Sequence, residues 1–346
     1  MQKETIEGFR LSPQQRHLWG LQQNNPKQIY GVRGAILITG NLDREILKSA
    51  LQNVVNRHEI LRTSFHCLPG MTLPLQAIAC TGEVPISEYN LSGLSPEEQE
   101  AKIAALFQQL SLLPFDFERG PLWHLSLVTL AQDKHLLLAN FSALIADSAT
   151  LKNLTRELSL SYSACACGEE FSDKSMQYAD IAVWQNELLE SEETAIGQEY
   201  WRKLNIESLD LLTLPWEKKN GEAEFKPLVE RVEIRGDLLN SLEAIAPKHK
   251  SDISAFLLTC WQILIWRLTR EPNPIIGVAI DGRRYEELVH SLGLLCKYLP
   301  LRCPVQDELD FSQARQQVEL NLKEMYNWQE YFSWEEILEN EQSSSF

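Results

Sequence analysis

The chain has 346 residues, of which 44% are hydrophobic and 23% are charged, values typical of a globular protein. With 32 basic and 48 acidic residues, its net charge of −16 disfavours nucleic acid and anionic membranes, because both bind to basic surfaces. The polar N-terminus lacks the apolar core of a signal peptide, and no apolar run is long enough to span a bilayer. Seven scattered cysteines predict reduced thiols and no metal site, so we expect a cytoplasmic location.

The first half of the chain alternates helix-like and strand-like patterns. LSPQQRHLWGLQQ predicts a short helix that begins at the N-cap Ser12. GVRGAILITG then predicts a strand, followed by a stretch with a helical apolar stripe and by the strand-like RTSFHC. Two apolar runs around the polar AQDK predict a β-hairpin from Pro121 to Phe141. Leucines at helical spacing after Asp147 predict a further helix, joined to the hairpin by a loop.

In the second half, a charged and turn-rich stretch at residues 214–227 predicts a connection. Beyond it, VERVEIR predicts a strand and DLLNSLEAIAPKH a helix capped by Asp237. SDISAFLLTCWQILIWRL predicts a more buried helix, and NPIIGVAIDGRR a strand that ends in a turn. Mixed strands and helices in two successive halves predict an α/β or α+β protein with two lobes.

Five stretches in this order resemble the sequence motifs of condensation domains of nonribosomal peptide synthetases. LSPQQRHLWGLQQ resembles the family's first motif, and RHEILRTSF, which contains Arg57, His58 and Arg62, resembles the second. YADIAVWQ resembles the fourth motif, IIGVAIDGRRYEELVHSLGLLCKYLPLR the fifth, and NWQEYFSWEEIL, more loosely, the sixth. The order and spacing agree from Leu11 to about Leu338, so the resemblance covers nearly the whole chain.

The resemblance implies the two-lobed fold of chloramphenicol acetyltransferase, with a mixed sheet and helices in each lobe and a cleft or tunnel between the lobes. We expect an N-terminal lobe of residues 1–178 and a C-terminal lobe of residues 179–346. Condensation domains continue past the sixth motif into strands that close the second lobe. The end of this sequence at Phe346 therefore predicts a truncated C-terminal lobe.

The third motif of the family is His-His, three residues, then Asp-Gly, and it aligns with SALIADS at residues 142–148. Ser142 and Ala143 replace the two histidines, and only Asp147 remains. In the family, the second histidine takes a proton from the acceptor amine or orients that amine, tasks that suit an imidazole because its pKa lies near neutrality. Ala143 has no group that can do either. The resemblance also implies a structural pair between Asp147 and Arg283, the arginine of the fifth motif.

Two interpretations of the activity stay open. The first is an acyltransferase with altered or impaired chemistry, which forms amides through proximity, through Ser142 or through a residue outside the motif. The second is a non-catalytic module that docks carrier proteins or recruits a tailoring enzyme. An acyltransferase that uses coenzyme A on the same fold is disfavoured, because those enzymes also keep the histidine.

Under the two open interpretations, the resemblance implies the same partners. They are peptidyl or acyl carrier proteins and neighbouring synthetase domains, and nucleic acid and membranes are not among them. The substrates are thioesters on the phosphopantetheine arms of the carrier proteins, and no cofactor is bound directly.

Overall fold

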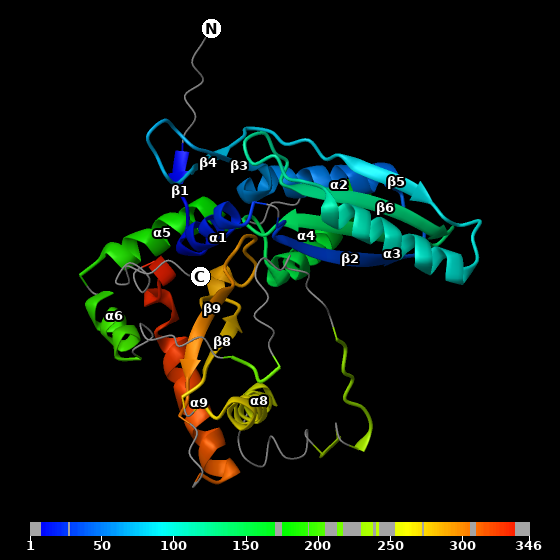
Figure 1. Cartoon of the computed structure of the whole chain (residues 1–346). Coiled ribbons are helices and arrows are strands. Elements are labelled where there is room, and N and C mark those ends of the chain that lie inside the picture. Colours follow the sequence, from blue (N-terminus) through cyan, green and yellow to red (C-terminus); the bar gives the residue numbers. More distant parts are fainter. Residues whose placement is uncertain are drawn as a thin grey trace. The chain divides into compact units, whose positions relative to one another are not determined.

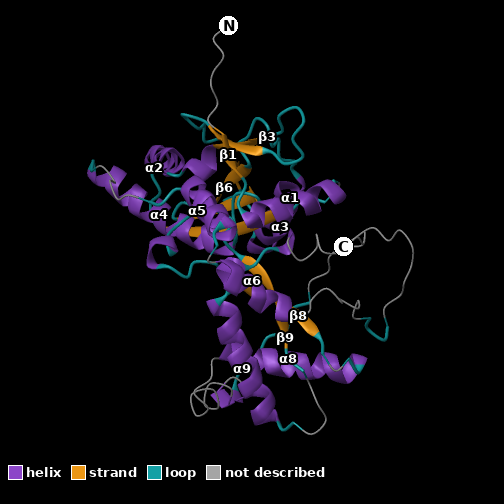
Figure 2. Ribbon diagram, turned by 90° about the vertical axis from the view of Figure 1, so that its left-hand side faces the viewer, coloured by secondary structure: helices purple, strands orange, loops and turns teal. Residues whose placement is uncertain are grey.

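The computed structural model describes residues 8–26, 28–169, 175–192, 194–204, 213–216, 230–237, 240–241, 253–271, 273–304 and 309–335. The chain divides into two compact units, the first of Met1–Ser191 with Asp281–Lys297 and the second of Glu192–Ile280 with Tyr298–Phe346. Each unit combines helices and strands, so the predicted mixed α/β class is confirmed (Figures 1 and 2). The units differ from the expected lobes chiefly because residues 281–297 cluster with the N-terminal part. The lobe boundary at residue 178 stays a prediction.

The first unit is built on a four-stranded sheet with the strand order β2-β7-β6-β5. β2 (Gly31–Thr39), β7 (Lys134–Ser142) and β6 (Trp123–Ala131) pair antiparallel, and β5 (Ile86–Asn90) lies parallel to β6 at the edge. β6 and β7 form the predicted hairpin, and it is therefore confirmed. Its register places the side chains of Leu127 and Leu137 opposite each other.

Helices cover both faces of this sheet (Figure 1). α2 (Arg44–Arg57) and α4 (Ser148–Cys167) share a core with Leu127 and Leu137, whereas α3 (Pro96–Leu112) shares one with Val128 and Leu138 on the other face. Because helices cover both faces, residues 127–128 of β6 and 136–139 of β7 are apolar on both faces, whereas β6 begins with alternating apolar and polar residues. Packing on both faces of the sheet holds β7 in place, and this strand leads directly into the loop at residues 142–148.

A second sheet of the first unit has three short strands, β1 (Gly8–Arg10), β4 (Leu75–Ile78) and β3 (Thr63–His66), in the order β1-β4-β3. α1 (Pro13–Asn24) follows β1 and begins at Ser12, as predicted. The Ser12 hydroxyl accepts the backbone N–H of Gln15, and the Gln15 side chain accepts that of Ser12. This reciprocal capping box satisfies two N–H groups that a helix start otherwise leaves unpaired.

The described part of the second unit contains α6 (Thr194–Lys203), α8 (Ile253–Thr269), α9 (Phe311–Asn327) and a sheet of β8 (Ile275–Ile280) and β9 (Lys297–Arg302) (Figure 2). β8 is the strand predicted from NPIIGVAIDGRR. The core of this unit is formed by Trp201, Leu299, Leu301, Cys303, Val318, Met325 and Phe332, and partly buried aromatic side chains, including Tyr200 and Trp328, pack against it.

Two predictions for the second half are wrong. Residues 230–235 of the expected strand VERVEIR form no regular structure, and the buried helix exists as α8 but is not covered on all sides. Its buried positions include the polar Thr259 and Gln262, whereas Trp261 is 53% exposed. An apolar composition favours burial of a helix but does not specify which neighbours cover each of its faces. The helix expected after Asp237 lies largely outside the described residues.

No helix in the described ranges is both long and apolar enough to cross a membrane. All seven cysteines carry free thiols.

Candidate functional site

The loop that aligns with the third motif connects β7 to α4. Three backbone hydrogen bonds hold its first half: Ser142 donates its N–H to the carbonyl of Leu122 at 2.8 Å, Ala143 donates to that of Tyr30 at 2.9 Å, and Ile145 donates to that of Ser142 at 3.0 Å. From Ser142 to Asp147, every residue is buried except Ala143, which is partly exposed. Ala143, the residue that the motif alignment predicts at the position of the family's reactive histidine, is therefore partly accessible, and its side chain is a methyl group.

Ser142 is buried, and its hydroxyl accepts the backbone N–H of Leu144 at 3.3 Å. Among the described residues, no imidazole or carboxylate contacts this hydroxyl. His135 lies on the same strand, but its ring contacts the hydroxyl of Thr129 at 3.3 Å. Because a serine hydroxyl needs an adjacent base to become a nucleophile, this geometry does not activate Ser142.

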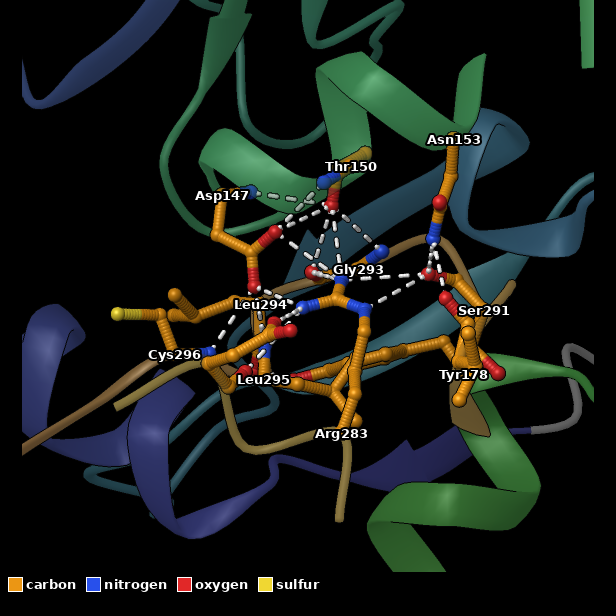
Figure 3. Close-up of polar contacts among 12 residues, drawn as sticks. Asp147, Thr150, Asn153, Tyr178, Arg283, Ser291, Gly293, Leu294, Leu295 and Cys296 are labelled. Carbon is orange, nitrogen blue, oxygen red and sulfur yellow. Dashed lines mark hydrogen bonds and ion pairs between the residues drawn. The ribbon is translucent and has the colours of Figure 1, made fainter. Parts of the chain in front are cut away.

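Asp147 and Arg283 lie together in the first unit although 136 positions separate them in the sequence (Figure 3). The guanidinium donates to both carboxylate oxygens at 2.8 and 3.0 Å, and both side chains are buried. Burial opposes the charge of Arg283. The hydrogen bond and the attraction of Asp147, with a smaller contribution from Asp281, outweigh it and raise the pKa of Arg283. The result is a bidentate ion pair in the interior of the first unit.

The Asp147 carboxylate accepts four further hydrogen bonds (Figure 3). One oxygen accepts the backbone N–H and the hydroxyl of Thr150, each at 2.8 Å, so that Asp147 also caps α4. The other accepts the backbone N–H groups of Leu295 and Cys296, each at 3.0 Å. With three donors on each oxygen, this carboxylate is saturated as an acceptor. Its role in this arrangement is structural, and it is poorly placed to take a proton from a substrate.

Side chains of α4 extend this network to the segment at residues 281–297. The Thr150 hydroxyl lies 2.8 Å from the carbonyl and 3.1 Å from the N–H of Gly293. The Asn153 amide donates to the carbonyls of Val289 at 2.8 Å and Ser291 at 3.2 Å. Neither Thr150 nor Asn153 was predicted, because nothing in a single helix indicates contacts with a segment about 140 residues away. Their spacing of three places both on one face of α4, which is the one available signal.

Tyr178 secures the same segment from α5 (Tyr178–Glu190). Its hydroxyl donates to the carbonyl of Leu294 at 2.8 Å and lies 2.8 Å from the Ser12 hydroxyl. Its ring packs so closely on Gly293 that a Cβ atom there would lie 2.0 Å from a ring carbon. Gly293 also has a φ of 135°, which residues with a side chain rarely adopt. The first and fourth motifs thus meet the fifth in one cluster.

Cys296 is the nucleophilic residue type within this cluster. Burial raises the pKa of its thiol to about 11, the charges of Asp147 and Asp281 act in the same direction, and Arg283 opposes them. Since the thiolate is the reactive form, Cys296 is protonated near neutral pH and does not provide a nucleophile.

The second-motif residues form a different cluster in the first unit. His58 Nε2 and Arg57 Nε each lie 3.3 Å from the same oxygen of Glu157, which is buried on α4. Arg62 donates to three backbone carbonyl groups. These contacts join α2, the turn after it and α4, so the second motif has a structural role here.

We expect Glu157 to make the first unit sensitive to acid. Burial raises the pKa of this carboxyl, but the hydrogen bond to His58 and the charges of Arg57, His58 and Arg156 together outweigh burial and lower it. An unfolded glutamate titrates near about pH 4.3, so the stabilisation is complete above that pH and is lost as the pH falls through the lower folded value.

Between about pH 5 and about pH 3, the free energy of unfolding of the native protein should therefore fall more steeply than that of Glu157→Gln. The measurement is urea denaturation at each pH, with Glu45→Gln as a control on an exposed face of α2, where the native slope should be retained. Equal slopes for the native protein and Glu157→Gln would contradict this assignment.

Comparison with known proteins identifies the chain's relatives. A family model described as Condensation domain matches residues 6–344. The chain is 31% identical over 325 residues to tyrocidine synthase 2 of Brevibacillus parabrevis, which covers 93% of this chain and 9% of that protein. It is 27% identical over 336 residues to bacitracin synthase 3 of Bacillus licheniformis, with 95% and 5% covered. The chain therefore spans less than a tenth of the length of these relatives.

Solved structures show the same fold. The first condensation domain of the calcium-dependent antibiotic synthetase, in complex with a substrate analogue, superposes with a TM-score of 0.84 at 18% identity and covers 98% of this chain and 80% of that one. The X-domain in its complex with OxyB from teicoplanin biosynthesis gives a TM-score of 0.72 at 20% identity, with 96% and 73% covered. The predicted fold class, that of chloramphenicol acetyltransferase-like condensation domains, is confirmed.

Proposed function

The chain belongs to the condensation-domain family, and on this premise we propose that it acts in a nonribosomal peptide synthetase assembly line as a carrier-protein-binding domain with impaired amide-forming chemistry. One observation carries the proposal. Residue 143 is the accessible position of a loop that is otherwise buried from Ser142 to Asp147, and it is an alanine. The backbone that would present a histidine is retained, but the proton-handling group is missing.

The network around Asp147 supports a domain that keeps its structure but lacks the group that would handle the proton. Burying two charges is unfavourable unless they are paired and their remaining hydrogen-bonding groups are satisfied. Here the ion pair with Arg283 is complete, and Thr150, Leu295 and Cys296 supply further donors to the carboxylate. The interactions that hold the motif loop against the fifth-motif segment are thus intact, although the loop has lost both histidines.

The alternative, in which the chain is an enzyme with altered chemistry, would need another base. Ser142 has a backbone N–H as its partner, Asp147 has six donors, and the thiol of Cys296 is protonated. These contacts are compatible with an enzyme only if it accelerates amide formation by holding the two substrates close together, without a base. A role in recruiting a tailoring enzyme is the second candidate, because the X-domain, which has the same fold, is seen in complex with OxyB.

The proposed partners are peptidyl or acyl carrier proteins and neighbouring synthetase domains, with substrates carried on phosphopantetheine arms. The proposed location is the cytoplasm. The relatives are synthetases many times longer than this chain, which supports a place among neighbouring domains.

A binding titration tests this proposal. The 346-residue chain is titrated with a panel of carrier proteins from nonribosomal peptide synthetases, each bearing an aminoacyl phosphopantetheine arm with an amide in place of the thioester. We expect saturable binding to at least one carrier protein, and tighter binding with the loaded arm than with the unmodified carrier. Absence of binding across the panel would refute both the binding function and the enzymatic alternative.

A further inference from the structure

A pocket of about 490 Å³ lies on the α3 face of the four-stranded sheet in the first unit. Its floor is formed by neighbouring residues of β5 and β6, including Ser87 and Ser126, which lie opposite each other in the parallel register. Its wall is formed by the last turns of α3 and the residue after them, including Leu106, Leu110 and Leu113. This volume is within the range of small-molecule sites.

None of the eleven residues that line the pocket is an aspartate, glutamate, lysine or arginine, which is unusual for a chain with 32 basic and 48 acidic residues. An ion that entered would lose water without gaining an opposite charge, which is costly, and the net charge of −16 disfavours an anion further. The lining therefore favours a neutral ligand.

Ser126 supplies a polar group at the pocket floor. The residue is 5% exposed, and its hydroxyl, which makes no hydrogen bond to another described residue, is open to the pocket that it lines. A polar atom in such a position forms its hydrogen bond with solvent or with a ligand. His124 beside it is already held, because its ring stacks on Phe115 and its Nε2 lies 3.3 Å from the carbonyl of Pro114. The free hydroxyl at the pocket floor therefore offers a hydrogen bond to a molecule in the pocket.

From these features we propose that the pocket binds a neutral amphiphile. The ligand has an apolar ring or chain, which packs against the leucines of α3, and one hydroxyl, aromatic amine or amide group, which forms a hydrogen bond with Ser126. The inference does not depend on the proposed function. The pocket is built from α3, β5 and β6, and none of its lining residues belongs to the motif loop or to the Asp147 cluster.

A pair of fluorescent probes tests the proposal on the full chain. N-phenyl-1-naphthylamine is neutral and carries one N–H group, and 1-anilinonaphthalene-8-sulfonate has the same rings with an added sulfonate. We expect saturable binding of the neutral probe and at least roughly tenfold weaker binding of the sulfonate. Leu113→Glu places a charge on the pocket wall. Because Leu113 is 42% exposed, we expect this variant to fold like the native chain, and its affinity for the neutral probe should be roughly tenfold lower.

Leu94→Glu is the matched control, because Leu94 is 40% exposed and lies outside the pocket. Its affinity for the neutral probe should equal that of the native chain. Ser126→Ala removes one hydrogen bond between the protein and the ligand and should lower the affinity for the neutral probe by roughly three- to tenfold.

Three results would overturn the proposal: no saturable binding of the neutral probe, equal affinity for both probes, or equal affinities in Leu113→Glu and Leu94→Glu. The last result would place the probe elsewhere on the protein. Leu112→Glu, at a lining residue that is 66% exposed, provides a second variant with the same expected loss as Leu113→Glu.

Discussion

Replacing Arg283 by alanine is expected to lower the free energy of unfolding by roughly 3–5 kcal/mol, because it leaves the buried Asp147 carboxylate without its counter-charge. Three residues of the network would remain as donors, Thr150, Leu295 and Cys296, but none of them carries a positive charge. The measurement is urea denaturation followed by tryptophan fluorescence, to which Trp123, buried in the same unit, contributes.

Arg284→Ala is the matched control, because it removes the same charge from the next residue, which is exposed and whose guanidinium lies 5.9 Å from the Tyr285 ring. A surface substitution of this kind usually changes stability by less than about 0.5 kcal/mol. In the double variant Asp147→Ala/Arg283→Ala, the loss should be smaller than the sum of the two single losses, because no unpaired charge remains. Equal effects of Arg283→Ala and Arg284→Ala would show that the ion pair does not hold the fifth-motif segment.

Restoring the histidine is expected to have the largest effect on chemistry. A positioned general base typically contributes about 10²–10⁴-fold in rate. Ala143 is partly exposed, whereas its neighbours Ser142 and Leu144 are buried, so we expect an imidazole at this position to reach solvent with little displacement of buried side chains. We therefore expect Ala143→His to form amide from two carrier-bound thioesters faster than the native chain, by up to about 10²–10⁴-fold.

Two controls distinguish proton handling from a change in structure. Ala143→Phe places a ring without a titratable nitrogen at the same position, and it should give no gain. The gain in Ala143→His should also fall as the pH decreases below about 6.5, because a protonated imidazole cannot accept a proton. A gain of the same size in Ala143→Phe would show that packing, and not a base, limits the native chain.

The parts of the structure that were predictable from sequence are those with local causes. Ser12 begins α1 because a hydroxyl at that position satisfies helix N–H groups, and the hairpin of β6 and β7 follows from two apolar runs around a polar turn. The exposed face of α8 was not predictable, because composition does not define the neighbours of a helix. The region around Asp237 lies largely outside the described residues.

In the candidate site, too, the features without a local cause could not be predicted from the sequence pattern. The contact between Asp147 and Arg283 spans 136 positions, and no periodicity indicates it, so it was inferred from family resemblance alone. Thr150 and Gly293 were missed because their roles appear only when the two segments are brought together. The burial of residues 142–147 except Ala143 was likewise visible only in three dimensions, since SALIADS contains small and apolar residues on both sides of that position.

A single-turnover condensation assay on the native chain tests the central claim most directly. The chain is mixed with an acyl-loaded donor carrier protein and an aminoacyl-loaded acceptor carrier protein to which it has been shown to bind, and amide product is followed by mass spectrometry. Because Ala143 supplies no base, we predict product at or near the rate measured without the chain, and faster product with Ala143→His under the same conditions. Rapid amide formation by the native chain, at the level of Ala143→His or above, would contradict the claim that this scaffold has lost its proton-handling group.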